Sequence, residues 1–294
     1  MPIRYQSLRR TQNKLSSMKR RFKTFLRKTS FAPRKLLISS ISRVNPCSFW
    51  LRPANYSEES DFLARRLNTD PDGIHSLILD YVSKSGQLNI LDLGCGNGVL
   101  GQDIRNKYGD KHYLCGIEID PQCAEMARPY YDDLFIGDIM NLQFLKGSWR
   151  KFDLILLVEV IEHLMTPSVV LRNLHRFLKA DGIVYITTPN VAHWSIRLRL
   201  AVRGNFGPDL LTLDPTHVRF FTFTSLEQML KKSGYEVISK IPVPWPKGSM
   251  SQVCRRYAHK FVRPIQRKLT TWFPGIFAFQ MAVFTRSRLK GNQT

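Results

Sequence analysis

The sequence predicts an α/β fold built on a mostly parallel sheet, and three observations carry that prediction. Short apolar runs alternate with segments whose apolar residues lie three or four positions apart, as buried strands alternate with amphipathic helices. The segment 152–158 is an almost continuous apolar run, as expected of a central parallel strand buried on both faces. A glycine cluster at 94–98 separates another apolar run from helical spacing, which indicates a strand, a tight turn and a helix N-terminus.

The other elements follow from the same two periodicities and from the Gly and Pro residues between them. Helices are expected at 57–84 with a break at Asp70-Pro71, at 167–178 and at 225–232. Strands are expected at 90–93, 112–117, 152–158, 183–188, 234–241 and 277–285, and the segment 134–139 is expected to contain a short strand followed by an acid. Apolar residues every four positions from Val253 to Leu269 predict a basic amphipathic helix, bent or broken at Pro264. Its apolar stripe either packs on the sheet or faces a membrane.

The glycine cluster predicts a loop that binds a cofactor. Gly94, Gly96 and Gly98 have no Cβ, so their backbone can adopt positive φ and bring N–H groups against a ligand at the helix end. The spacing from Gly96 to Gly101 also fits the G-x-G-x-x-G pattern of dinucleotide enzymes. Asp92 argues against a dinucleotide, because a carboxylate just before the loop would repel a pyrophosphate and attract an ammonium group.

Acidic residues also follow the next two predicted strands. Glu118 ends the strand about twenty residues after the loop, where an acid can accept hydrogen bonds from both ribose hydroxyls. Asp138 follows the third strand and suits an adenine amino group. A ligand with an amine, a ribose and an adenine therefore accounts for all three acids.

Together, these stretches resemble the cofactor motifs of the class I S-adenosylmethionine-dependent methyltransferases, at 91–98, 116–121 and 137–138. The resemblance covers about residues 89–286 and implies a Rossmann-like, seven-stranded methyltransferase sheet with helices on both faces and an antiparallel last strand. It implies S-adenosylmethionine as cofactor, with Asp92 and the loop glycines facing the methionine part and Glu118 the ribose. Ile119 would cover the adenine face, and Asp138 with the N–H of Ile139 would bind its edge. Taken alone, such an acid is equally a helix cap or a turn residue.

A second polar cluster, Glu159, Glu162 and His163, follows the predicted fourth strand, where open α/β sheets bind their ligands. His163 and His217 are candidate catalytic bases, with Glu162 beside them, because an unperturbed imidazole titrates near neutral pH. Glu159, Glu162, His163 and His217 would alternatively bind a divalent cation that orients and acidifies a hydroxyl. Since a histidine at a strand end is often structural, these roles stay open.

The E-x-x-E-H pattern at 159–163 resembles that of two metal-assisted groups: the ubiquinone-biosynthesis O-methyltransferases and the enzymes that methylate the 2′-oxygen at the 3′ ends of small RNAs. The segment 182–234 resembles the bacterial ubiquinone-type and polysaccharide-associated methyltransferases, and many members of the wider superfamily share the pattern without a metal. Members of that bacterial group act on small, lipid-linked or glycan acceptors. The basic N-terminus departs from that group and leaves the acceptor open.

Positive charge is concentrated at the two ends of the chain, whose formal net charge is +21. Residues 1–52 contain fourteen Lys and Arg, residues 241–294 contain ten, and neither stretch contains an acid. We expect a basic extension at 1–52, partly disordered or amphipathic, and a methyltransferase domain at 53–290. Within that domain, 190–215 would be an acceptor-side insertion and 242–276 a basic amphipathic excursion. Such ends favour contact with an anionic membrane, or with nucleic acid.

The function expected from all this is S-adenosylmethionine-dependent O-methylation of a small-molecule, lipid-linked or glycan acceptor. An RNA 2′-O-methyltransferase is one alternative, weakened by the lack of a recognisable RNA module. A non-catalytic methyltransferase-like binding protein is another, weakened by the intact cofactor loop. Five cysteines without paired spacing indicate a reducing compartment. No apolar run reaches the ~18 residues of a spanning helix, so we expect a cytoplasmic protein, at most peripheral at the membrane surface.

Overall fold

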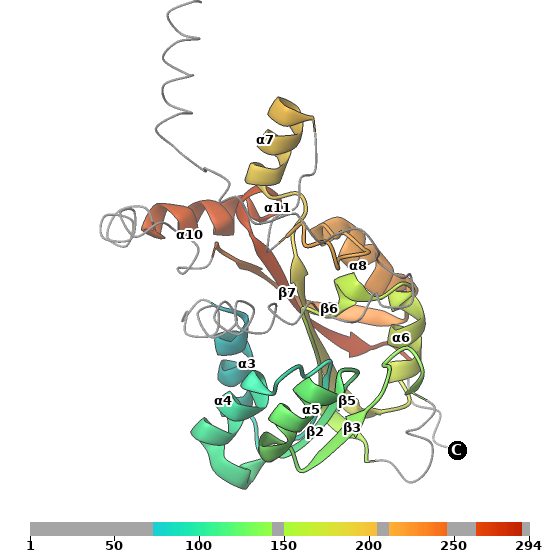
Figure 1. Cartoon of the computed structure of the whole chain (residues 1–294). Coiled ribbons are helices and arrows are strands. Elements are labelled where there is room, and N and C mark those ends of the chain that lie inside the picture. Colours follow the sequence, from blue (N-terminus) through green and yellow to red (C-terminus); the bar gives the residue numbers. More distant parts are fainter. Residues whose placement is uncertain (1–72, 143–149, 205–211, 246–262, 290–294) are drawn as a thin grey trace, which may run out of the picture. The chain divides into compact units, whose positions relative to one another are not determined.

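The computed structural model describes residues 73–142, 150–204, 212–245 and 263–289, which form a seven-stranded sheet with helices (Figure 1). The strand order is β3-β2-β1-β4-β5-β7-β6, and β7 runs antiparallel to both of its neighbours. The predicted Rossmann-like sheet with an antiparallel last strand is therefore confirmed. The helices expected within 1–72 and over 253–262 lie outside the described residues, and the predicted domain boundaries stay predictions.

The strands are β1 Asn89–Leu93, β2 Tyr113–Glu118, β3 Asp133–Ile136, β4 Phe152–Val158, β5 Leu178–Pro189, β6 Tyr235–Val243 and β7 Gln280–Ser287. The α-helices are α3 Ile74–Ser83, α4 Val99–Tyr108, α5 Pro121–Ala127, α6 Pro167–Leu174, α7 Trp194–Arg203, α8 Phe223–Lys232, α10 Arg263–Trp272 and α11 Pro274–Phe277. Short 3-10 helices are η2 Gly109–Lys111, η3 Arg128–Tyr130 and η5 Ile161–His163.

The apolar core lies in two layers, one on each face of the sheet. Leu91 and Leu93 of β1 pack in the layer that includes α6 and α8. Ile90, on the opposite face, packs in the layer that includes α3 and α4. Because successive side chains of a strand alternate between faces, Asp92 shares the face of Ile90. Asp92 therefore lies beneath α3, which precedes β1, and α4, which follows it.

Three predicted element boundaries are wrong by three residues or more. α6 ends at Leu174 and β5 already begins at Leu178, because Leu178 pairs with Phe152 before the register shifts. The last strand begins at Gln280 rather than at 277, because 274–277 form the short helix α11. Pro264 lies within α10, next to its first described residue, Arg263, so the predicted bend or break there stays a prediction.

The parallel strands end at one edge of the sheet, which we call the carboxyl edge. Leu93 pairs with Ile117, and Val158 pairs with Thr187. The antiparallel β7 starts at the same edge, since Gln280 pairs with Pro189 at the end of β5. The loops after β1, β2, β3, β4 and β5 therefore lie at the same edge of the sheet as the chain that enters β7.

Candidate active site

The glycine loop joins β1 to α4 at the carboxyl edge. Gly94, Gly96 and Gly98 have φ angles of 72°, 56° and 83°, in the left-handed region that favours glycine. Gly94 and Cys95 donate their N–H groups to the carbonyl of Ile117, which fixes the loop against β2. A Cβ added to Gly96 would meet no atom within 4 Å, so the backbone there faces open space. The loop is thus anchored on one side and accessible to a ligand on the other.

Asp92 lies two residues before this loop and is only 4% exposed. The Tyr131 hydroxyl donates a hydrogen bond to Asp92 Oδ2 at 2.6 Å. Burial raises the pKa of Asp92 to about 6, against the Tyr131 hydrogen bond, which favours the ionised carboxylate. The carboxylate is therefore mostly ionised at neutral pH, as the binding of an ammonium group requires.

Gly101 makes the Tyr131–Asp92 contact sterically feasible. A Cβ added to Gly101 would lie 2.7 Å from two atoms of the Tyr131 ring, closer than packed side chains approach. The last glycine of the G-x-G-x-x-G match is therefore explained by the tyrosine that packs on it.

Glu118 ends β2 and is 8% exposed. Its carboxylate accepts hydrogen bonds from the N–H groups of Gly96 at 2.7 Å, Ile119 at 2.9 Å and Asp120 at 3.0 Å. These backbone donors orient the carboxylate beside the glycine loop, where the sequence predicted a ribose. The Ile119 side chain, predicted to cover the adenine, is 38% exposed and so accessible.

Asp138 and Ile139 follow β3. Asp138 is exposed, and its Oδ1 accepts from the N–H of Met140 at 2.8 Å, which is the turn geometry that the sequence left as an alternative. The Ile139 side chain is buried in the core. All the predicted cofactor residues thus lie at the ends of β1, β2 and β3, and their individual roles stay predictions.

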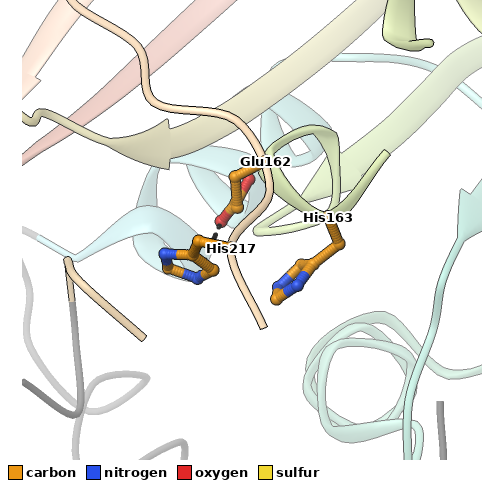
Figure 2. A group of neighbouring side chains, drawn as sticks. All are labelled: Glu162, His163 and His217. Atoms are coloured by element: carbon orange, nitrogen blue, oxygen red, sulfur yellow. Dashed lines mark ion pairs between the residues drawn. The ribbon is translucent and has the colours of Figure 1, made fainter. Parts of the chain in front are cut away.

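The second cluster is assembled from η5 and the segment 212–222. The N–H groups of Val218 and Arg219 donate to the Glu162 carbonyl at 3.0 and 2.9 Å. The Arg219 guanidinium also donates to the carbonyl of Met165 at 2.7 Å. These bonds hold the segment against η5 and bring His217 beside Glu162 and His163 (Figure 2).

One ligand atom from each of Glu162, His163 and His217 lies within 4.8 Å of the other two. His163 Nδ1 is 3.1 Å from the carbonyl oxygen of Thr216, and His217 Nδ1 is 3.1 Å from that of Thr212. Since a carbonyl oxygen only accepts, each neutral imidazole carries its proton on Nδ1 and presents the Nε2 lone pair. This is how metal-binding histidines are usually oriented.

Glu162 is 1% exposed, and its carboxylate oxygens have no hydrogen-bond partner among the described residues. The Nε2 atom of His217 is 3.9 Å from Glu162 Oε1 (Figure 2). Burial, together with the negative charge of Glu159, raises the pKa of Glu162 well above its ordinary value. Because a buried, unpaired carboxylate is costly and a positive charge would favour its ionised form, the donor set fits a divalent cation.

Glu159, predicted as a fourth ligand, lies outside this group of ligand atoms. Gln280 Nε2 donates to Glu159 Oε2 at 2.9 Å, and the Glu159 N–H donates to Thr187 Oγ1 at 3.0 Å. Its φ of 55° is the only positive value among the described non-glycine residues. Burial raises the pKa of Glu159 to about 7. The structure therefore gathers three of the four predicted donors, because bonds to β5 and β7 hold the fourth.

Sequence reasoning missed the residues that hold the site residues in place. Tyr131, Thr216 and Gln280 each act through a contact with a segment distant in the sequence, and Thr212 acts through a contact with His217, five residues later. No motif marks any of them. Only the Asp214-Thr216 pair carries a local signal, because an Asp two residues before a Thr is typical of a turn.

The sheet order, the glycine loop and the acids at the ends of β1 and β2 define a class I S-adenosylmethionine-dependent methyltransferase. A family model described as a methyltransferase domain matches residues 52–240, and the chain belongs to that family. S-adenosylmethionine is accordingly its cofactor.

The chain is also similar to proteins named "Ubiquinone biosynthesis O-methyltransferase". The one from Neisseria meningitidis serogroup A is 28% identical over 176 residues, which cover 56% of this chain and 71% of that protein. The one from Glaesserella parasuis is 27% identical over 110 residues, 34% of this chain and 45% of that protein. The predicted resemblance to the ubiquinone type is confirmed.

A solved structure supports the fold. The plantazolicin methyltransferase BamL, in complex with a triazolic desmethylPZN analog and SAH, matches with a TM-score of 0.53 and 16% identity. The match covers 82% of this chain and 93% of that one. At this identity the likeness concerns the fold alone.

Proposed function

We propose that this methyltransferase transfers the methyl group to a hydroxyl oxygen of a small-molecule, lipid-linked or glycan acceptor. The observation that carries the proposal is the Glu162, His163 and His217 cluster, in which each imidazole has Nδ1 against a backbone carbonyl oxygen and Nε2 left for a ligand or a proton. Hydroxyls need such help because they are weak nucleophiles until their proton is removed. The names of the relatives, which specify O-methylation, support the same chemistry.

In this proposal one group of residues binds the cofactor and another removes the proton from the acceptor. Asp92 would hold the cofactor's ammonium group, Glu118 its ribose hydroxyls, and both would fix the direction of the reactive sulfonium. When bound, S-adenosylmethionine supplies the methyl group, and in-line attack by the acceptor oxygen forms the O–C bond while the C–S bond breaks. Nε2 of His163 or His217 would accept the proton that leaves the hydroxyl.

A bound divalent cation would be a second way for this cluster to activate the acceptor hydroxyl. Glu162, His163 and His217 would hold it, and it would lower the pKa of the acceptor hydroxyl. The two imidazoles would then be ligands rather than bases. An imidazole base and a bound cation would both activate a hydroxyl. In either case the cluster therefore favours oxygen, rather than nitrogen or carbon, as the methylated atom.

The test is a methyl-transfer assay with labelled S-adenosylmethionine and a panel of acceptors. The panel holds hydroxylated aromatics, lipid-linked hydroxyls, glycans and RNA oligonucleotides, each with Mg²⁺, Mn²⁺ or Zn²⁺ and with a chelator. We expect label on an oxygen of one of the first three classes. Loss of transfer in chelator would assign the cation, and retained transfer would assign an imidazole base.

Variants make the assay specific to the cluster. Glu162→Gln should lower transfer at least about a hundredfold and leave S-adenosylmethionine binding unchanged by calorimetry. Glu236→Gln, at an exposed position on β6, is the matched control and should behave as wild type. Transfer to nitrogen or carbon only, or full activity of Glu162→Gln, would refute the proposal.

A further inference from the structure

Helix α10 packs on the rest of the protein through its polar side. Arg263 Nη1 and Gln266 Nε2 both donate to the carbonyl of Trp245, at 3.2 and 3.5 Å. Thr270, on the same side of the helix, is 2% exposed and donates to the carbonyl of Phe277 at 3.2 Å. Positions three and four apart share one face of a helix, so this buried face is polar.

The opposite side of α10 and α11 is apolar and faces outward. Ile265 is 59% exposed, Trp272 67%, Phe273 53% and Ile276 38%. Leu269 lies between them at the same helical spacing and is partly exposed. We call these five residues the α10–α11 surface. An amphipathic helix of a globular protein normally turns its apolar face to the core, so the orientation here is inverted.

The charged residues of α10 itself all have the same sign. Lys268 and Arg267, both exposed, come from the same helix, and residues 241–294 contain ten Lys and Arg and no acid. Exposed Trp, Phe and Ile side chains surrounded by cations are typical of helices that lie in the headgroup region of a bilayer. A stacking platform for nucleic acid would need aromatic rings in series, whereas three of the five residues of this surface are aliphatic.

Helix α7 continues the same pattern nearby. Asn190, just before α7, donates Nδ2 hydrogen bonds to the carbonyls of Gly275 and Ala278 at the end of α11, at 3.4 and 2.8 Å. Figure 1 shows α7 projecting beside α11. Trp194, Leu198 and Val202 of α7 are 46 to 61% exposed. This helix carries three arginines and no acid.

The surface lies at the carboxyl edge of the sheet, because β7 starts there directly after α11. No helix within the described residues is long and apolar enough to cross a membrane. Contact through these side chains would therefore be with the face of a bilayer. We propose that the α10–α11 surface docks on an anionic phospholipid membrane, with Trp272 and Phe273 inserted among the headgroups.

The test is co-sedimentation of the full chain with vesicles of phosphatidylglycerol mixed with phosphatidylcholine, and with phosphatidylcholine alone. We expect binding to the anionic vesicles that weakens with salt. The double variant Trp272→Ser/Phe273→Ser should lower partitioning about tenfold or more, since two large apolar side chains no longer leave water. Ile238→Ser/Leu289→Ser, at positions 48 and 59% exposed outside the surface, is the matched control and should bind as wild type.

A second readout separates this surface from the basic extension at 1–52. Brominated lipids should quench wild-type tryptophan fluorescence, and Trp272→Phe should reduce quenching while it keeps vesicle binding. Circular dichroism and cofactor binding verify that each variant is folded. Wild type that ignores anionic vesicles, or a double variant that binds like wild type, would overturn the proposal. The second result would assign binding to another part of the chain.

Discussion

The cofactor side and the acceptor side of the site differ in how their parts are brought together. On the cofactor side, Asp92, the glycine loop and Glu118 belong to consecutive elements, and the loop bonds directly to Ile117 and Glu118 of the neighbouring strand. On the acceptor side, His217 reaches Glu162 only because a segment more than fifty residues later is bonded to η5. The first side is fixed by adjacent βα units, and the second by a few long-range backbone hydrogen bonds. We therefore expect the two sides to fail independently.

The largest expected effect is on the cofactor side. Asp92→Asn should weaken S-adenosylmethionine binding about a hundredfold, because a charge-assisted contact to the ammonium group is lost. Wild-type affinity should fall as the pH drops through about 6, where burial places the pKa of Asp92, and the variant should show no such dependence. Calorimetry across pH measures both, with Asp110→Asn, at an exposed carboxylate, as the control.

A stability measurement excludes a merely structural role for Asp92. Its pKa is raised on folding, so its contribution to stability is present at low pH and is lost as the pH rises through about 6. Asp92→Asn should therefore unfold at no lower temperature than wild type at pH 8. Unfolding at a markedly lower temperature would contradict this account.

Two glycines of the loop should respond differently to the same substitution. Gly98→Ala should cost about 2–4 kcal/mol of stability, because φ is positive and the new Cβ would lie 2.7 Å from Ala127 Cα. Gly96→Ala should cost only about 1 kcal/mol, since its Cβ meets nothing, yet it should weaken cofactor binding. Denaturant unfolding and calorimetry on both variants test this. Equal losses of stability in the two variants would contradict this account, because they would mean that the loop is packed at Gly96 as well as at Gly98.

On the acceptor side, Asp214 should act as a positioning residue. Its Oδ1 accepts from the N–H and the hydroxyl of Thr216, at 2.8 and 2.5 Å, and Thr216 in turn anchors His163. Asp214→Ala should lower Mn²⁺ affinity about tenfold without changing S-adenosylmethionine affinity. Asp181→Ala, in an exposed part of β5, is the control. A parallel loss of cofactor affinity would mean that the two sides are coupled.

The smallest effect is expected at the tyrosine under the loop. Tyr131→Phe removes the hydrogen bond that favours ionised Asp92, so the pKa of Asp92 should rise further. Cofactor affinity should then drop a few-fold at pH 7 and recover toward pH 8.5. A loss that does not recover at higher pH would assign Tyr131 to packing alone.

The difference between the cofactor side and the acceptor side also explains how much of the site could be predicted from the sequence. The cofactor residues were predictable because each lies at or near the end of a strand, and parallel strands bring their carboxyl ends to one edge of the sheet. His217 was predicted only as a candidate, since nothing local ties it to η5. Glu159 lies outside the group of three ligand atoms because Gln280, 121 residues away, donates to one oxygen of its carboxylate, and its role as a ligand stays a prediction.

The orientation of helix α10 likewise could not be predicted from the sequence. The sequence gives an apolar stripe and a basic surround, but periodicity leaves open which face of a helix packs inward. Hydrogen bonds from Arg263 and Gln266 to the Trp245 carbonyl turn the polar face inward and leave Trp272 exposed.

The sequence by itself determined the strand and helix alternation, the loop and the class of cofactor, because these depend on spacing within one or two neighbouring elements. Tertiary structure alone decided which donors gather around Glu162, what holds Asp92 ionised, and which face of α10 meets the solvent. The physical reason is that contacts between distant segments depend on the packing of the whole sheet, which no local pattern encodes.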